Sequence, residues 1–242
     1  MSVPNLAPIQ PAPLAQSERI SAADQIFDAL HVQILTMELA PGTRLSETEV
    51  GQQFAVSRQP VRDAFFRLAQ LGFLVIRPQR ATIVSPISIE AVMQARFVRA
   101  SLELETTRIA CEVMGNGDHA ALRGLLAQQK AAMEAGDKVE FHRLDDAFHR
   151  EICERAGVGF VWDVVRVNKA HIDRVRFLSL SFASARTFAE HERIMDAIEA
   201  RDAPTATAEM RQHLSQIRSL IGRIRDENAE MFVPGEPVPE IL

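Results

Sequence analysis

The sequence predicts a mainly α-helical protein made of two folded parts. Its 242 residues are more than one average domain needs. Apolar residues recur at helical spacing along most of the chain, and strand-like runs occur only in "FLVIR" and "ATIVS". Hydrophobic residues make up 47% and charged residues 24%, and no apolar run is long enough to span a bilayer. This composition excludes a membrane protein and fits a globular one.

The first twenty residues are rich in proline and alanine, and we expect residues 1–20 to form a disordered arm. They have neither the basic start nor the continuous apolar stretch of a secretory signal. The chain's two cysteines, Cys111 and Cys153, lie in helix-like patterns and suit a reducing compartment better than a disulfide framework. We therefore expect a cytoplasmic protein.

Three helices are predicted at the start of the first folded part. One begins at about Ser21 and ends before "APG". A short second helix begins in "SETEVGQQF", where Ser46 and Glu49 have the spacing of a capping box. Ser57 can cap the third helix, and Gly72 can end it.

Two short strands, "FLVIR" and "ATIVS", follow and are joined by "PQR". The order helix, helix, turn, helix, hairpin over residues 21–86 is that of a winged helix-turn-helix with a small β-hairpin wing. This domain places its third helix in the major groove of DNA, where arginine can pair with guanine and glutamine with adenine.

The charge distribution supports a nucleic-acid interface in this segment. The whole chain has a net charge of −5, but residues 41–86 contain six arginines against three acidic residues. The alternative to a DNA-binding surface is that these arginines simply form a solvent-exposed face. The capped helices, the wing and the local positive charge occur together here, which disfavours that alternative. The candidate DNA-binding residues are Arg44, Ser57, Arg58, Gln59, Arg62, Gln79 and Arg80.

Residues 88–230 contain little strand signal and read as an all-α helical bundle, followed by a flexible tail over residues 231–242. One helix begins near Ser88, and others run through "FHRLDDAFHREICERAG", "TFAEHERIMDAIEARD" and "EMRQHLSQIRSLIGRIRDE". Thr187 with Glu190, and Asp202 ahead of Pro204, have the spacing of helix starts, so we expect the last two helices to begin there.

Several polar side chains fall on inward stripes of these helices. Asp145 and His149 are four residues apart and share a helix face, and His191 and His213 lie among apolar residues at helical spacing. Three imidazoles and a carboxylate can hold one divalent metal ion with positions left open, with zinc as the first choice and nickel or manganese as alternatives. Asp146 could substitute for Asp145.

The remaining histidines are interpreted as surface or packing residues: His31, His119, His142 and His171. Arg99 lies on an inward stripe of the helix that begins near Ser88, and a buried arginine needs an anionic partner.

The segment "APGTRLSETEVGQQFAVSRQPVRDAFFRLAQLGFL" resembles the DNA-binding domain of GntR-family transcription regulators. The resemblance implies that Arg58 and Arg62 contact operator DNA. Two positions depart from the family: Glu49 stands where some members have a basic residue, and Ala81 follows Arg80 where a glycine is usual. We therefore assign no DNA contact to Glu49.

Residues 88–226 resemble the helical FCD effector domain of the FadR-type GntR subfamily, through "VRASLELE", "LDDAFHREI", "EHERIMDAI" and "MRQHL". The resemblance implies a homodimer on a near-palindromic operator and an effector carboxylate bound by Arg99. It also implies four metal ligands: Asp145, His149, His191 and His213.

We therefore expect a ligand-responsive DNA-binding transcription regulator, a repressor, whose helical domain binds a small carboxylate or sugar acid at a divalent-metal site. It would be cytoplasmic and associated with the nucleoid, and it would be no enzyme. Two alternatives stay open. The metal could itself be the signal, or be structural, without an organic effector; or the helical half could be a metal-dependent enzyme, since an open metal position can activate water.

Overall fold

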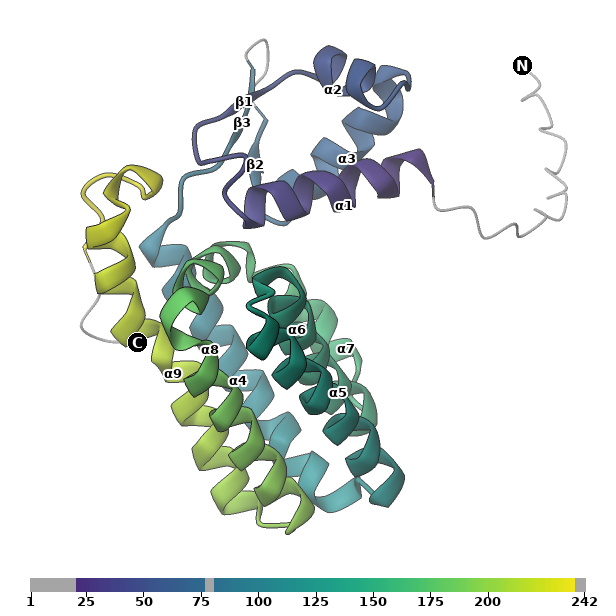
Figure 1. Cartoon of the computed structure of the whole chain (residues 1–242), viewed down its shortest axis with the longest axis vertical. Helices are drawn as coiled ribbons and strands as arrows, with labels where there is room; N and C mark the ends of the chain where they lie inside the picture. The colour runs from purple at the N-terminus through teal and green to yellow at the C-terminus, as the bar shows by residue number, and fades with distance from the viewer. Residues whose placement is uncertain (1–20, 77–80, 238–242) are drawn as a thin grey trace, which may run out of the picture.

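The computed structural model describes residues 21–76 and 81–237. Figure 1 shows two domains, one stacked on the end of the other. The N-terminal domain contains the elements α1 (Ala22–Leu35), β1 (Arg44–Leu45), α2 (Glu47–Gln53), α3 (Arg58–Gln70), β2 (Leu74–Val75) and β3 (Thr82–Val84). The helical domain contains α4 (Ile89–Val113), α5 (Asn116–Ala135), α6 (Lys138–Arg155), α7 (Phe160–Arg166), α8 (Ala170–Glu199), α9 (Ala203–Glu227) and the short 3₁₀ helix η1 (Ala229–Met231). The predicted fold class, a winged helix-turn-helix followed by an all-α bundle, is confirmed.

Local sequence sets the helix ends of the N-terminal domain. The hydroxyl groups of Ser21 and Ser46 accept hydrogen bonds from backbone N–H groups in the first turns of α1 and α2. Ser57 occupies the predicted cap position of α3, but its side chain makes no capping hydrogen bond. Gly72, at φ +81°, adopts the left-handed conformation that ends α3.

The three strands form an antiparallel sheet in the order β1-β3-β2. The sequence predicted β2 and β3 but not β1, whose two residues are too few to show an alternating pattern. Ile26, Ile34, Phe65 and Leu68 bury their side chains in a core shared by α1, α3 and the sheet. This core fixes the start of α3 on the outer surface of the domain.

In the helical domain, α8 is one helix over thirty residues, so the predicted helix start at Thr187 is wrong. Apolar side chains such as Val175, Leu180 and Ala183 are buried on the N-terminal side of Thr187, and they keep the chain helical through the local capping signal. The other predicted start is confirmed, because the Asp202 carboxylate accepts a hydrogen bond from the N–H of Thr205 at the start of α9.

The C-terminal segment also differs from the predicted tail. Residues 231–237 pack against the start of α4: Phe232 is buried and pairs with Ile87 through a parallel bridge. The Glu236 carboxylate accepts hydrogen bonds from Ser88 Oγ and the N–H of Ile89. This acidic cap complements the positive end of the α4 dipole, which explains why the segment is held.

The predicted N-terminal arm, residues 1–20, and the tail residues 238–242 lie outside the described residues. No helix in the described ranges combines the length and the apolar character needed to cross a membrane.

Candidate functional sites

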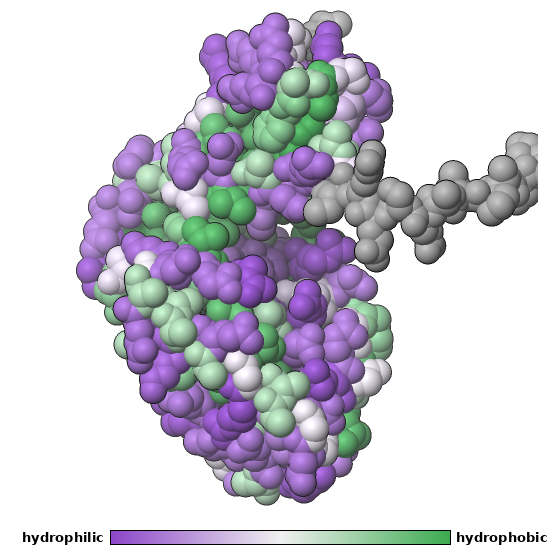
Figure 2. All heavy atoms as spheres, turned by 45° about the vertical axis from the view of Figure 1, so that its right-hand side comes forward, coloured by the Kyte–Doolittle hydropathy of each residue, from purple (hydrophilic) through white to green (hydrophobic). Residues whose placement is uncertain are grey.

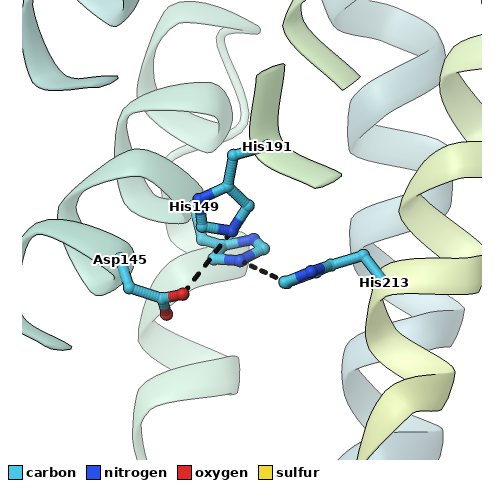
Figure 3. Close-up of side chains that lie close together, drawn as sticks. All are labelled: Asp145, His149, His191 and His213. Atoms are coloured by element: carbon cyan, nitrogen blue, oxygen red, sulfur yellow. Dashed lines mark hydrogen bonds and ion pairs between the residues drawn. The ribbon is translucent and has the colours of Figure 1, made fainter. Parts of the chain in front are cut away.

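Three helices bring the four predicted metal ligands together. Asp145 and His149 come from α6, His191 from α8 and His213 from α9, and their side chains point toward one another (Figure 3). All four are buried, and one donor atom of each lies within 4.8 Å of the others. His149 Nε2 lies 3.2 Å from His213 Nε2, and His191 Nε2 lies 3.5 Å from Asp145 Oδ1.

A second ring of polar groups orients each imidazole. His149 Nδ1 lies 2.7 Å from Glu103 Oε2, and His213 Nδ1 lies 3.0 Å from Glu190 Oε2. His191 Nδ1 lies 2.9 Å from Gln129 Oε1. An ionised carboxylate or an amide oxygen only accepts, so the Nδ1 atoms of His191 and His213 carry the proton and their Nε2 atoms present a lone pair to the centre. The Glu103 carboxylate favours the same tautomer of His149 by its proximity, although that pair falls outside hydrogen-bond geometry.

Four acceptor atoms therefore converge without a hydrogen between them. Within the described ranges, Asp145 Oδ1 and His191 Nε2 are buried and have no hydrogen-bond partner. Two lone pairs 3.2 Å apart, as between His149 and His213, repel unless a cation lies between them. Ligands about 2.0–2.2 Å from one ion are about 2.8–3.6 Å apart at right or tetrahedral angles, so the donor set fits a divalent ion.

The electrostatics keep these groups in their metal-binding protonation states. Burial lowers the pKa of His191 well below its ordinary value and that of His213 to about 4, so both imidazoles are neutral. Burial alone would raise the pKa of Asp145, but the charge of Arg176 is the largest opposing influence, and the pKa lies well below its usual range. Arg176 Nη2 donates to Asp145 Oδ2, which leaves Oδ1 directed at the histidines.

Arg99 has an internal partner that the sequence analysis did not identify. Its guanidinium is 2% exposed and donates to Glu103 through Nε at 2.6 Å and Nη2 at 3.3 Å. Burial alone would lower the pKa of Arg99, but the charge of Glu103 raises it above its ordinary value. The anionic partner that a buried arginine requires is thus already present, although Arg99 also lines a cavity of about 40 Å³ beside the predicted metal ligands.

Four site residues were missed in the sequence: Glu103, Gln129, Arg176 and Glu190. Glu103 lies one turn after Arg99 on an inward stripe, and that spacing could have identified it. Gln129 and Arg176 carry no comparable signal, because their roles depend on how α5 and α8 pack.

The structure also separates Asp145 from its proposed substitute. Asp146 accepts a hydrogen bond from Lys169 and faces the other way, toward His142 and Asp173. Among the histidines left aside, His31 stacks on Phe27, and His171 accepts a hydrogen bond from the N–H of Ser88. His119 is partly buried outside the cluster.

The candidate DNA-reading surface lies at the start of α3. Arg58 and Arg62 are exposed, with 62% and 58% of their side chains accessible, and both donate hydrogen bonds to Glu47 on α2. Gln59 donates to Asp63. Glu47 was not identified in the sequence; it holds the two arginines side by side on the outer face.

Of the other predicted DNA-contact residues, the structure describes some and not others. Arg44 is exposed on β1, and Ser57 is exposed at the α3 cap. Gln79 and Arg80, expected at the wing tip, lie outside the described residues.

Comparison with known proteins gives consistent matches. Residues 22–84 match the family described as bacterial regulatory proteins, gntR family, and residues 94–216 match the FCD domain. The HTH-type transcriptional repressor RspR of Escherichia coli is 37% identical over 86% of this chain and 92% of its own length. Two solved structures share the fold: E. coli McbR/YncC (TM-score 0.72, 21% identity, 86% of this chain and 99% of that one) and a putative GntR regulator from Rhodococcus (TM-score 0.70, 18% identity, 83% and 97%).

Proposed function

Because the chain belongs to the GntR family of bacterial regulatory proteins, in the FadR-type arrangement with a C-terminal FCD domain, we propose that it is a repressor controlled by a small organic acid at a divalent-metal site. The relatives are transcription regulators and not enzymes, and the chain is a DNA-binding transcription regulator like them. Repression is the activity named for RspR and is proposed here for this chain.

The observation that carries the metal part of the proposal is the convergence of acceptor atoms. Asp145, His149, His191 and His213 would hold the ion, and zinc is the first choice for this donor set, with nickel and manganese as alternatives. A bound divalent ion would supply a positive charge to which a carboxylate can coordinate. Glu103, Glu190 and Gln129 keep the three imidazoles oriented toward it.

The class of effector follows from the cavity beside these ligands. Arg176 lines the cavity, and its buried Nη1 has no hydrogen-bond partner in the described part of the chain. Arg99 lines it too, but shares its guanidinium with Glu103. A volume of about 40 Å³ accommodates a few water-sized groups, so we infer a compact carboxylate or a small sugar acid, bound chiefly by Arg176.

The DNA-binding part rests on the start of α3. We infer that Arg58 and Arg62 read or clamp the major groove, supported by Gln59, Ser57 and Arg44. A homodimer would present two such helices to the halves of a near-palindromic operator in the cytoplasm. The effector would act by shifting the equilibrium between domain arrangements that can and cannot bind DNA. A change of about 1–3 kcal/mol in the free-energy difference between them is enough to alter operator occupancy.

The DNA-binding surface is tested with Arg62→Ala in a salt titration on an operator selected from a random duplex pool. A phosphate contact predicts weaker binding to all sequences and a salt slope smaller by about one ion, whereas a base contact predicts relaxed preference at one position. Arg193→Ala, an exposed arginine of α8, is the matched control. Unchanged affinity, slope and preference would remove Arg62 from the interface.

The effector site is tested by operator binding of metal-loaded and chelator-stripped protein, with and without a panel of small carboxylates and sugar acids. We expect a carboxylate to change operator affinity only in the loaded protein, and Arg176→Gln to abolish that response. Operator binding that follows the metal alone and ignores every carboxylate would instead favour the metal as the signal.

A further inference from the structure

A second, larger cavity lies between the two domains. Its volume is about 370 Å³, within the range of ordinary small-molecule sites. Figure 2 shows the surface hollowed at this level, between the upper and the lower domain. The N-terminal domain contributes residues of α1 and of the segment after α3, and the helical domain contributes α6, α7 and the start of α8. A molecule bound here would touch both domains.

One wall of this interdomain cavity is apolar and aromatic. Phe27, Leu35, Leu71 and Phe73 line it from the N-terminal domain, and Trp162 lines it from α7. His31 lies among them, stacked on Phe27 and edge-on to Phe73. Burial lowers the pKa of His31, so the imidazole adds a neutral ring to this wall. The wall suits a flat ring.

The charged lining favours an anion. Four basic side chains line the cavity against two carboxylates, those of Asp146 and Asp173. Lys169 Nζ lies 2.7 Å from Asp146 Oδ2 and 2.6 Å from Asp173 Oδ2, so these three groups largely satisfy one another. The remaining basic residues are Arg143, Arg150 and Arg166, and all three are more than 45% exposed at the side chain.

Two of these arginines have only distant anionic partners. The closest carboxylate contact is 3.9 Å from Arg150 and 3.5 Å from Arg166. Such long ion pairs between exposed side chains contribute little to the stability of the fold. A ligand anion can therefore replace these carboxylates with little loss of free energy. The mouth of the cavity is therefore positively charged and available.

The floor of the cavity presents an unused acceptor. Asp173 is 3% exposed, and its Oδ1 has no hydrogen-bond partner in the described ranges. His142 Nε2 lies 4.0 Å from this oxygen, which is too far for a hydrogen bond. A buried acceptor left unpaired is costly, and a ligand hydroxyl or amino group would satisfy it.

We propose that the interdomain cavity binds a ring-bearing organic anion that carries a hydroxyl or amino group. The ring lies against Phe27, Phe73 and Trp162, the anionic group meets Arg150 and Arg166, and the donor group reaches Asp173. This site is separate from the four metal ligands and does not depend on the metal. Its effect on operator binding does rest on the proposed function, because the ligand would fix the two domains relative to each other.

A metal ion is the competing occupant, since donor atoms of His142, Asp146 and Asp173 lie within 4.8 Å of one another. The ammonium of Lys169 already bonds both carboxylates and takes the place of a cation there. A ligand that leaves this ammonium in position is therefore favoured over a metal.

Trp162 provides the test, because it is the single tryptophan of the chain and tyrosine is absent from the sequence. The probe is anilinonaphthalene sulfonate, which carries rings, an anionic group and an N–H donor. Titrated into the full chain, it should quench Trp162 by energy transfer in a saturable step with one site per chain. Dye emission that rises while Trp162 stays unquenched would overturn the proposal.

Matched variants locate the site. Ala147→Leu fills the cavity, Val139→Phe fills it nearer the mouth, and Arg166→Gln removes a charge; each should weaken dye binding about tenfold. The control Arg193→Gln on the exposed face of α8 should bind like wild type. Filling variants that fold and bind dye as wild type does would overturn the proposal, as would an uncharged naphthol that binds as tightly as the sulfonate.

Two further measurements separate this site from the proposed function. Chelator-stripped protein and His213→Ala should both retain dye binding, and its loss in both would assign the dye to the metal site and overturn the proposal. Operator affinity that differs between dye-free and dye-saturated protein supports the coupling of the cavity to DNA binding, and an unchanged affinity contradicts that coupling.

Discussion

The three histidines of the proposed metal centre illustrate how far single residues can be predicted from a sequence. Each was identified because helical periodicity places it on an inward stripe and a family motif surrounds it. The groups that orient them were not identified, because Gln129 and Glu190 act on histidines far from them in sequence or on another helix. Side-chain partners across helices depend on packing, which a periodic pattern does not specify.

The role of Glu190 gives a first prediction. Glu190→Gln keeps the shape of the side chain but removes the charge that polarises His213, and it should lower metal affinity about tenfold. Competition against a chromophoric chelator measures the change. Glu192→Gln, an exposed residue of the same helix, is the control. Equal affinities of the two variants would show that Glu190 does not support the centre.

The ion pair of Arg99 and Glu103 gives a second prediction. Both side chains are almost fully buried, and Arg99→Ala would leave the Glu103 carboxylate without its main partner. We expect a loss of about 3–5 kcal/mol in the free energy of unfolding, measured by urea denaturation. Arg108→Ala, which breaks an exposed pair on the same helix, should cost less than about 1 kcal/mol. A similar small cost for both would contradict the structural role given to Arg99.

Elements were predicted well where the local signal and the packing agree. The helices of the N-terminal domain begin at their predicted caps, and α9 begins at Asp202. The prediction was wrong where a capping sequence occurs inside a longer helix, at Thr187. Short elements such as β1 were missed because two residues carry no periodicity.

This contrast between the two capping signals is measurable. Asp202→Ala removes a real helix cap and should destabilise the protein by about 1 kcal/mol, within a range of about 0.5–2 kcal/mol. Thr187→Ala lies within α8 and should change the free energy of unfolding by less than about 0.5 kcal/mol. Thermal or urea unfolding of the two variants decides the point, and a cost at Thr187 equal to that at Asp202 would argue for a helix break there.

At the scale of the whole molecule, the relative placement of the two domains could not be predicted. It depends on the connecting residues 85–89, which are held from several sides: Arg174 donates to the carbonyl of Ser85, and Glu236 caps the start of α4. His171 accepts hydrogen bonds at Nδ1 from the N–H of Ser88 and from Arg174. The partners of residues 85–89 in these contacts lie more than eighty positions away in the sequence, so no local sequence pattern predicts them.

His171 makes this junction sensitive to acid. Burial, with the charge of Arg174, lowers the pKa of His171 from 6.5 to about 4. Between pH 6.5 and 4, His171 therefore stays neutral in the folded protein but takes up a proton in the unfolded chain. Its contribution to the free energy of unfolding is complete above pH 6.5 and is lost as the pH falls toward 4. At about 1.4 kcal/mol per pKa unit, the loss amounts to at most about 3.5 kcal/mol.

The measurement is the free energy of unfolding of wild type and His171→Gln across this pH range. Other buried histidines destabilise both proteins alike, so the difference between the two isolates His171. The variant should lose less stability on acidification, because glutamine can accept the same hydrogen bonds without titrating. Parallel pH profiles would contradict the assignment.

We propose above that four converging acceptor atoms form a metal centre in the regulator's helical domain. This proposal is tested most directly by the metal content of protein purified without chelators, measured by mass spectrometry for wild type, His213→Ala and the control His119→Ala. We expect about one divalent ion per chain in wild type and control, and little or none in His213→Ala. A wild type that is metal-free as purified and takes up no ion on titration would contradict it.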